Sequence, residues 1–466
     1  MEYINEKLEE FKKYIKNKKV AIIGLGVSNI PLLDYLYNLE ANITVFDHRE
    51  ENEISQEIMS KLKKLDIQII NGIDCLDELK NFNVIFRSPS CLPSKPELIR
   101  EAENGALITT EIELLLKMYP GRSIGITGSD GKTTTSSLIY EIVKAGGYNC
   151  HLGGNIGTPL FTKLEEMTDE DILILELSSF QLMEMQISPN IAVITNISPN
   201  HLDLHNSYDE YIESKKNIFK YQEQNDTLIL NYDNEETKKL DIEANGKVIY
   251  FSSKSKLDNG IILDDGIIKE CKDRLRKHVL NTKDLKLRGI HNYENICAAI
   301  LATRDLVDVK SIANTLIDFN GVEHRIEFVR ENNNVKWYND SVSSSPTRAI
   351  AGINAFDEKI VLIAGGYDKN LDYAPMAKPI VDKVSTLILL GDTSTKIFDV
   401  VKEELEKQNK TIPIYVCENL EQTISLANKF SNSGEVVLFS PASASFDMFK
   451  NAVERGLKFK ELVNKI

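Results

Sequence analysis

One stretch decides the fold of this chain: Ser123-Ile124-Gly125-Ile126-Thr127-Gly128-Ser129-Asp130-Gly131-Lys132-Thr133-Thr134. A short apolar strand runs into a glycine-rich loop, and a helical pattern follows. Glycines let backbone N–H groups turn onto phosphate oxygens, and the helix presents its positive N-terminal end to them. The Lys132 side chain can reach the outer phosphates, and the Thr133 hydroxyl can hold magnesium. The stretch therefore predicts a site for a nucleoside triphosphate, contacted by Gly128, Ser129, Asp130, Gly131, Lys132, Thr133 and Thr134.

The composition is that of an ordinary globular protein. The chain has 466 residues, of which 42% are hydrophobic and 27% charged, and this length suggests about three domains. The net charge of −15 argues against a nucleic-acid partner, which clustered Lys and Arg would have to bind. No run approaches the ~20 apolar residues of a membrane span, and we expect the charged first residues to form an amphipathic segment rather than a signal peptide. We expect a cytoplasmic protein without a membrane partner.

The first part of the chain reads as a β-α-β unit. A buried strand at 19–23 leads into Gly24-Leu25-Gly26, a helix follows, and a second strand ends at Asp47. This order is typical of a Rossmann-like domain, in which an acidic residue at this place bonds a ribose or a base edge. The third glycine of the dinucleotide pattern is replaced by Asn29. An NAD-dependent oxidoreductase therefore stays an alternative on weak evidence.

The rest of the chain repeats the alternation of strands and helices, which predicts an α/β fold of three domains. We expect an N-terminal Rossmann-like domain at 1–113 and a central P-loop ATPase domain with a mostly parallel sheet at 114–321. A C-terminal Rossmann-like α/β domain follows at 322–466. Within the central domain, strands are predicted at 171–175, 191–196 and 227–230, and a small antiparallel patch between 247 and 287.

Polar residues follow the predicted central strands. Glu176 comes directly after the strand at 171–175, and His201 follows the next strand. Because ligands of open α/β sheets sit at the carboxyl ends of the strands, both side chains are candidates to hold magnesium. Lys215 lies on a predicted helix and reads, from the residues alone, as a surface cation.

Further polar clusters follow strands or open helices in the second half of the chain. They are His291-Asn292-Tyr293-Glu294-Asn295, Glu323-His324-Arg325, Asn339-Asp340-Ser341, Gly365-Gly366-Tyr367-Asp368-Lys369 and Ser440-Pro441-Ala442-Ser443-Ala444-Ser445-Phe446. Each cluster alone is a turn or a helix cap. Together they outline a pocket, in which Arg325 offers a permanently charged fork for phosphate.

These motifs, with Gly153-Gly154-Asn155-Ile156-Gly157 and Glu176-Leu177-Ser178-Ser179-Phe180-Gln181, occur in an order that resembles the Mur ligase family over essentially the full chain. Within that family the chain resembles the ligases that add D-glutamate. The resemblance implies an ATP-dependent amide ligase of peptidoglycan precursor synthesis. It implies UDP-N-acetylmuramoyl-L-alanine and D-glutamate as substrates, an acyl-phosphate intermediate, two magnesium ions and a monomer.

The resemblance also implies roles for single residues. Lys132, His201 and Lys215 would be catalytic. Thr133 and Glu176 would hold the first magnesium, and His201 with a carbamylated Lys215 the second. Further ATP contacts would be Asn292, Asn295, Arg325 and Asp340. Substrate contacts would be Val27, Ser28, Asp47, Arg49, Asn155, Ser178, Ser344, Lys369, Ser445 and Phe446.

The chain departs from the family pattern at two places. Many relatives have lysine where this chain has Val342, and Arg348 is a candidate to supply the missing cation. The N-terminal domain has Ser88-Pro89-Ser90 where relatives usually have Ser-Pro-Gly.

Other functions stay open at this point. They are a related ligase that adds L-alanine, a diamino acid or the glutamates of folate, the NAD-dependent oxidoreductase, and a nucleotide-switch protein without ligase activity.

Overall fold

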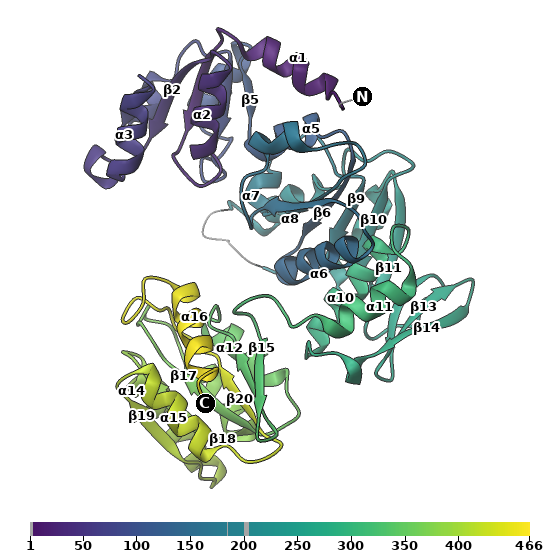
Figure 1. The fold of residues 1–466 in the computed structure, drawn as a ribbon, viewed down its shortest axis with the longest axis vertical. Helices are drawn as coiled ribbons and strands as arrows, with labels where there is room; N and C mark the ends of the chain where they lie inside the picture. Colours follow the sequence, from purple (N-terminus) through teal and green to yellow (C-terminus); the bar gives the residue numbers. More distant parts are fainter. Residues whose placement is uncertain (1–2, 184, 200–204) are drawn as a thin grey trace. The chain divides into compact units, whose positions relative to one another are not determined.

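The computed structural model describes residues 3–183, 185–199 and 205–466. Three sheets, flanked by helices, carry the fold (Figure 1), which confirms the predicted α/β class. The chain divides into two compact units, one reaching to Leu280 and including Glu294–Thr315, the other made of Asn281–Tyr293 and Leu316–Ile466. The domain limits near 113 and 321 stay a prediction. Within the described part of the chain, none of the helices combines the length and the apolar character that crossing a membrane requires.

The N-terminal sheet is parallel and has the strand order β3-β2-β1-β4-β5. Its strands are β1 (Lys19–Ile23), β2 (Asn42–Asp47), β3 (Gln68–Asn71), β4 (Val84–Arg87) and β5 (Leu107–Thr109). The helices of this part are α1 (Glu6–Ile15), α2 (Ile30–Asn38), α3 (Gln56–Lys64) and α4 (Pro96–Glu103). All apolar residues of β1 are buried, as expected for a parallel strand covered on both faces. The predicted β-α-β unit is confirmed.

Asn29 has a structural role in the turn after β1. Its buried side-chain amide donates hydrogen bonds of 3.0 Å to the carbonyl oxygens of Ile23 and Gly24. Gly24 has a φ of +81°, a conformation that glycine adopts without strain. The amide of Asn29 thus ties down the turn at the place where the dinucleotide pattern has its third glycine.

The central sheet has nine strands in the order β14-β13-β12-β11-β10-β9-β6-β8-β7. The strands are β6 (Arg122–Thr127), β7 (Cys150–Gly154), β8 (Ile172–Glu176), β9 (Ile191–Ile194), β10 (Thr227–Asn231), β11 (Lys247–Ser252), β12 (Gly260–Asp264), β13 (Ile267–Lys272) and β14 (Leu275–Asn281). The helices are α5 (Glu111–Met118), α6 (Lys132–Ala145), α7 (Ser179–Leu182), α8 (Tyr208–Lys216), α9 (Glu235–Lys239), α10 (Ile290–Thr303) and α11 (Val309–Asp318). Helix α6 packs against β6, β7 and β8.

The predicted antiparallel patch is wrong in part. Strand β11 pairs in parallel with both β10 and β12, and the antiparallel pairing begins only between β12 and β13. The segment therefore extends the central sheet instead of forming a separate patch. The residues between 247 and 287 fit either pairing, because alternation with turns does not fix the direction of a neighbouring strand.

The C-terminal sheet has the order β15-β16-β20-β17-β18-β19. Its strands are β15 (Glu327–Asn332), β16 (Val335–Asn339), β17 (Ile360–Ala364), β18 (Val384–Leu390), β19 (Ile414–Cys417) and β20 (Val436–Phe439). Its helices are α12 (Pro346–Asn354), α13 (Ala374–Lys383), α14 (Ser394–Gln408), α15 (Leu420–Phe430) and α16 (Ala452–Val463). One core cluster joins the sheet to α12, α13 and α14, and a second joins it to α15 and α16. Helices therefore cover both faces of this sheet.

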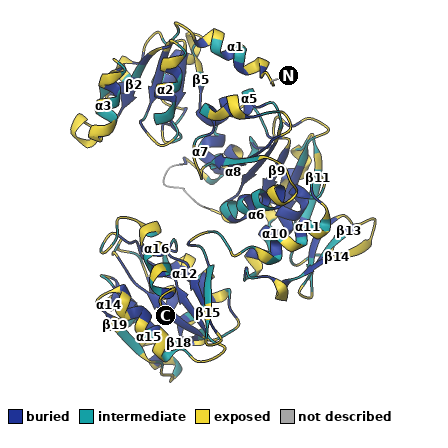
Figure 2. Ribbon diagram, in the orientation of Figure 1, coloured by how far each residue is buried: buried dark blue, intermediate teal, exposed yellow. Residues whose placement is uncertain are grey.

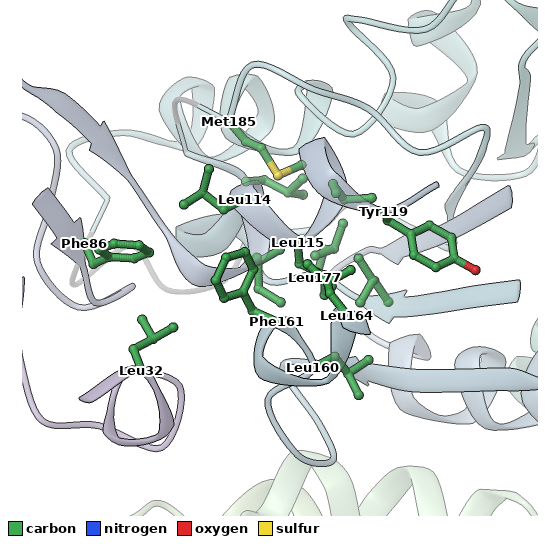
Figure 3. Close-up of a cluster of buried hydrophobic side chains, with 14 of the residues drawn as sticks. Leu32, Phe86, Leu114, Leu115, Tyr119, Leu160, Phe161, Leu164, Leu177 and Met185 are labelled. Carbon is green, nitrogen blue, oxygen red and sulfur yellow. The ribbon is translucent and has the colours of Figure 1, made fainter. Parts of the chain in front are cut away.

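Burial follows these layers: the strands are mostly buried and the helices expose their outer faces (Figure 2). In the first unit, one core cluster includes side chains of α1, α2, α5 and the short helix that begins at Phe161. The fully buried ring of Phe161 contacts the rings of Phe11 and Tyr35 edge to face, with centroids 5.6 Å apart in each pair. Figure 3 shows this ring among its neighbours.

We predict that Phe161→Ala lowers the free energy of unfolding of this unit by about 3–5 kcal/mol, because the cavity cannot collapse fully. Denaturant unfolding followed by circular dichroism measures the change. Leu275→Ala is the control, since Leu275 is 77% exposed and its loss should cost less than about 0.5 kcal/mol. Equal unfolding midpoints for the two variants would contradict the importance of this cluster.

Candidate active site

The glycine-rich loop between β6 and α6 is closely packed. Gly131 caps α6 with a φ of +83°, and Gly128 has a φ of +149°. A Cβ atom on Gly131 would lie 2.3 Å from Asn295 Oδ1, and one on Gly128 would lie 2.0 Å from Thr195 Oγ1. Both positions therefore require glycine. The predicted order of strand, glycine-rich loop and helix is confirmed, and phosphate binding by this loop stays a prediction.

Two lysine side chains meet at one carbonyl oxygen of this loop. Lys132 Nζ donates to Gly128 O at 2.8 Å and to Ser129 O at 3.0 Å. Lys215 Nζ donates to the same Gly128 O at 3.0 Å and to Thr127 Oγ1 at 3.2 Å. Since both ammonium groups are close to one oxygen, they are close to each other. The arrangement favours an anion beside them, or the loss of one of the two charges.

Lys215 is not the surface cation that its residue type and helix suggested. The side chain is 1% exposed and lies over the ring of Tyr211, with Nζ 4.6 Å from the ring centroid. Burial, followed by the charge of Lys132, lowers the pKa of Lys215 well below its usual value. Tyr211 and Lys215 are one turn apart on α8 and share its buried face. Among the described residues, no carboxylate lies within ion-pair distance of Lys215 Nζ.

Tyr211 connects α8 to the glycine-rich loop, a role that the sequence analysis missed. Its hydroxyl lies 2.9 Å from Ser129 Oγ, which also donates to Ser198 O at 2.9 Å. Tyr211 is 1% exposed. The only signal in the sequence is its spacing of four residues from Lys215, which has no meaning until the helix is known to pack against the loop.

Glu176 lies at the same sheet edge as the loop. The register pairs it with Ile126 of β6 on one side and with Gly154 of β7 on the other. Its Oε1 accepts a 2.8 Å hydrogen bond from Asn155 Nδ2. Its Oε2 is buried and has no hydrogen-bond partner among the residues that the structure describes. A buried carboxylate oxygen without a partner is costly, so a cation at this place would satisfy it.

The remaining predicted residues of the first unit have defined surroundings. Asn295 Oδ1 accepts a 3.3 Å hydrogen bond from Thr135 Oγ1 of α6, and its contact to ATP stays a prediction. Ser178 caps α7 in a capping box with Gln181. Thr133 is half-buried and Thr134 is buried, both in the first turn of α6. His201 lies outside the described residues, so its role as a metal ligand stays a prediction.

The predicted uridine contacts of the N-terminal sheet form a compact group of their own. Asp47, 1% exposed, accepts hydrogen bonds from Leu25 N at 2.8 Å and from Arg49 Nη2 at 2.7 Å. Burial alone would raise the pKa of Asp47, but the hydrogen bonds from Arg49 and from backbone N–H groups outweigh burial and lower this pKa to about 2. Val27 is 74% exposed on the adjacent turn, and Ser28 is half-buried. Arg49 and Asp47 thus act as one unit beside that turn.

Asp340 is a buried carboxyl of the second unit. Its Oδ2 accepts a 2.7 Å hydrogen bond from Ser440 Oγ, and its Oδ1 accepts one of 3.2 Å from Ile326 N. Burial raises the pKa of Asp340 to about 7. Ile326, next to Arg325, has a φ of +43°, which is strained for a β-branched residue. Asp340 therefore holds a strained segment in place. In the same unit Asn292 Nδ2 donates to Arg288 O at 2.7 Å.

Lys369, Phe446 and Ser445 lie together at the carboxyl ends of the C-terminal strands. Lys369 Nζ is 5.5 Å from the centroid of the Phe446 ring, which is 59% exposed. Ser445 is 2% exposed. Ser344 and Val342 are half-buried, and Arg348 is exposed in the first turn of α12. Replacement of the missing lysine by Arg348 stays a prediction.

Family models match three consecutive parts of the chain. The Mur ligase MurD-like N-terminal domain matches residues 18–110, the Mur ligase middle domain matches 126–303, and the Mur ligase glutamate ligase domain matches 324–443. The middle-domain match contains Lys132, Glu176, Lys215 and Asn295.

Named relatives match over the full chain. Two proteins called UDP-N-acetylmuramoylalanine–D-glutamate ligase, from Acetivibrio thermocellus and Clostridium tetani, are 48% and 47% identical, each covering 99% of this chain and 100% of the relative. Two solved structures from Thermotoga maritima share the fold: the UDP-N-acetylmuramate-alanine ligase MurC, with 19% identity, and the MurF ligase in complex with ADP, with 18%. Both have a TM-score of 0.56, and they cover 96% and 97% of this chain and 99% and 97% of their own.

We predict that Gly131→Ala weakens ATP binding on the order of tenfold or more, because the new methyl group would collide with Asn295. Calorimetric titration with ATP measures the affinity. Gly147→Ala is a matched control, since Gly147 has a φ of +88° but no atom within 4 Å of a new Cβ. Equal affinities for the two variants would contradict the importance of the close approach between Gly131 and Asn295.

Proposed function

The chain belongs to the Mur ligase family, and we propose that it joins D-glutamate to UDP-N-acetylmuramoyl-L-alanine at the expense of ATP. The observation that carries the choice of substrates is the match to relatives of that name, at 48% and 47% identity over 99% of this chain. The protein is therefore a ligase of peptidoglycan precursor synthesis.

The chemistry explains why cations must converge at the site. A carboxylate is a poor electrophile, so one of its oxygens first attacks the γ-phosphorus of ATP and displaces ADP. The amine nitrogen of D-glutamate then attacks the acyl carbon of the acyl phosphate. The tetrahedral intermediate expels phosphate and loses a proton from nitrogen, which leaves the amide. Triphosphate and carboxylate repel each other, so positive groups must stabilise their approach.

The glycine-rich loop is suited to hold the triphosphate. Its backbone N–H groups and the N-terminal end of α6 would bind phosphate oxygens, and Lys132 would neutralise the transferred group. Lys132 Nζ now donates to Gly128 O and Ser129 O. Exchange of these carbonyl contacts for phosphate oxygens would bring the ammonium group onto the reacting phosphate. The ATP contacts proposed for Asn292, Asn295, Arg325 and Asp340 follow the same family pattern.

The residues at the sheet edge fit magnesium. Glu176 Oε2 is a buried oxygen without a hydrogen-bond partner in the described part of the chain, and Thr133 offers a hydroxyl at the start of α6, so these two would hold the first ion. Lys215, once carbamylated, would hold the second with His201. Bound magnesium would neutralise phosphate charge and polarise the phosphorus. Asn155, which donates to Glu176 Oε1 at 2.8 Å, would orient this carboxylate and contact the muramoyl substrate together with Ser178.

The remaining substrate contacts are proposed at the other two sheets. Val27, Ser28, Asp47 and Arg49 would hold the uridine diphosphate part. In the C-terminal sheet, Lys369 would bind a carboxylate of D-glutamate, with Ser344, Ser445 and Phe446 as further contacts. An NAD site is not proposed, because Asn29 replaces the third glycine of the dinucleotide pattern and its amide donates hydrogen bonds within the turn after β1.

The function is tested by phosphate release from ATP with UDP-N-acetylmuramoyl-L-alanine and one amino acid at a time. We expect turnover with D-glutamate and at most background with L-glutamate, L-alanine or meso-diaminopimelate. Lys132→Ala should abolish this turnover. Release that depends on another amino acid would identify a different ligase of the family, and release without any amino acid would contradict the ligase function.

We predict that Lys215→Ala lowers turnover on the order of 10²–10³-fold and that added short carboxylic acids restore part of it. The acid would replace the carbamate that a buried lysine can form with carbon dioxide. A carbamate signal from ¹³C-labelled bicarbonate in nuclear magnetic resonance gives a second, direct readout.

Lys216→Ala is the matched control for Lys215. Lys216 is the next residue of α8 and pairs at 2.6 Å with both Glu213 and Glu243, so its loss should leave turnover and the carbamate signal unchanged. A Lys215→Ala protein that keeps its turnover, or that no carboxylic acid rescues, would remove the carbamate from the mechanism.

A further inference from the structure

Three buried hydroxyl groups meet below the carboxyl ends of the C-terminal strands. Ser443 Oγ lies 2.8 Å from Tyr373 OH and 2.9 Å from Thr393 Oγ1. Ser443 and Thr393 are fully buried, and Tyr373 is 2% exposed. The three residues come from different parts of the sequence: Tyr373 precedes α13, Thr393 follows β18 and Ser443 follows β20. We call these three residues the hydroxyl cluster.

The hydroxyl cluster is joined to the glycine turn after β17. Gly366 N donates to Thr393 Oγ1 at 3.1 Å, and Thr393 N donates to Gly366 O at 3.0 Å. Gly366 has a φ of +151°, and a Cβ there would lie 2.3 Å from Ala444 O. The turn after β17 is therefore held tightly between the loops that follow β18 and β20.

The cluster is also joined to the loop that carries Ser445. The Ser443 carbonyl accepts a 3.0 Å hydrogen bond from Arg455 Nη2, and Ala444 O accepts one of 3.0 Å from Tyr367 N. Tyr367 lies two residues before Lys369, and Ser443 lies two residues before Ser445. The hydroxyl cluster thus sits between the two chain segments to which amino-acid contacts are assigned.

The hydrogen bonds of the cluster depend on one another. Thr393 Oγ1 accepts from Gly366 N and shares a second hydrogen bond with Ser443 Oγ, in which either hydroxyl can donate. Ser443 in turn shares its second contact with Tyr373. A buried polar network of this kind is rigid when every member is satisfied. Removal of one hydroxyl leaves a buried N–H or O–H without a partner, so the loops must shift to recover it.

We propose that Ser443, Thr393 and Tyr373 are positioning residues for the amino-acid substrate. They fix the spacing between the segment of Lys369 and the segment of Ser445, so that the two ends of the amino acid meet groups at a set distance. The inference rests on the proposed function, because the amino-acid contacts are part of it. A displacement of about 1 Å at a positioning group can cost up to about 100-fold in rate.

We predict that Thr393→Val raises the KM for D-glutamate on the order of tenfold, with the KM values for ATP and for UDP-N-acetylmuramoyl-L-alanine unchanged. Steady-state phosphate release measures all three. Thr393→Ser keeps the hydroxyl and should restore the KM. Ser443→Ala should act like Thr393→Val, and the double variant should show less than the product of the two single effects, because both remove one network.

Thr423→Val is the matched control. Thr423 is also fully buried in the same unit, and its hydroxyl donates to Asn419 O at 2.9 Å within α15, away from the substrate contacts in sequence. Thermal unfolding should show that both valine variants are folded, and only Thr393→Val should change the KM for D-glutamate.

The outcomes separate this inference from the function on which it rests. Suppose that Thr393→Val folds and has the same KM for D-glutamate as Thr423→Val and the unmodified protein. This result would overturn the positioning role, but the ligase function would stand. If the unmodified protein does not use D-glutamate, the proposed function itself is wrong. If Thr393→Val does not fold, Tyr373→Phe tests the other end of the cluster, with the same rise in KM expected and the same unchanged KM overturning the role.

Discussion

The approach of two ammonium groups to one carbonyl oxygen is the constraint on which the central site depends. Lys132 and Lys215 donate to Gly128 O at 2.8 and 3.0 Å. Two unit charges about 5 Å apart repel by roughly 3 kcal/mol at an effective dielectric constant of 20, and burial of Lys215 adds a desolvation cost. An anion beside the pair, or a neutral Lys215, would relieve this repulsion. Both conditions suit a site that receives a triphosphate and a carboxylate.

The parallel sheet explains how this convergence is built. Neighbouring strands end at one edge, so the register brings Glu176 next to Ile126 and Gly154 and starts the glycine-rich loop from the same edge. Glycine at 128 and 131 lets Thr195 and Asn295 approach the loop backbone. The site thus consists of short segments that lie close together because the parallel strands end at the same edge of the sheet.

The sequence correctly predicted features that depend on residues close together in the chain. The strand, loop and helix around Lys132 are contiguous, and Glu176 follows its strand directly, so their surroundings needed only the direction of the sheet. Lys215 and Tyr211 were misjudged or missed because their burial depends on how α8 packs against a loop 80 or so residues earlier. The parallel pairing of β11 was missed for the same reason: residue patterns describe one strand, whereas pairing is a property of two.

The two compact units surround their proposed substrate contacts with different kinds of side chain: charged in the first unit, neutral in the second. Lys132 and Lys215 belong to the first unit, where two neighbouring ammonium groups favour an anion beside them. Lys369 and Ser445 belong to the second unit, where the neutral hydroxyl cluster holds the loops around them. A buried polar network is rigid when every member is satisfied, and a network of neutral hydroxyls avoids the desolvation cost of buried charges. Neutral hydroxyls therefore suit a scaffold behind the segments that are proposed to hold the amino acid.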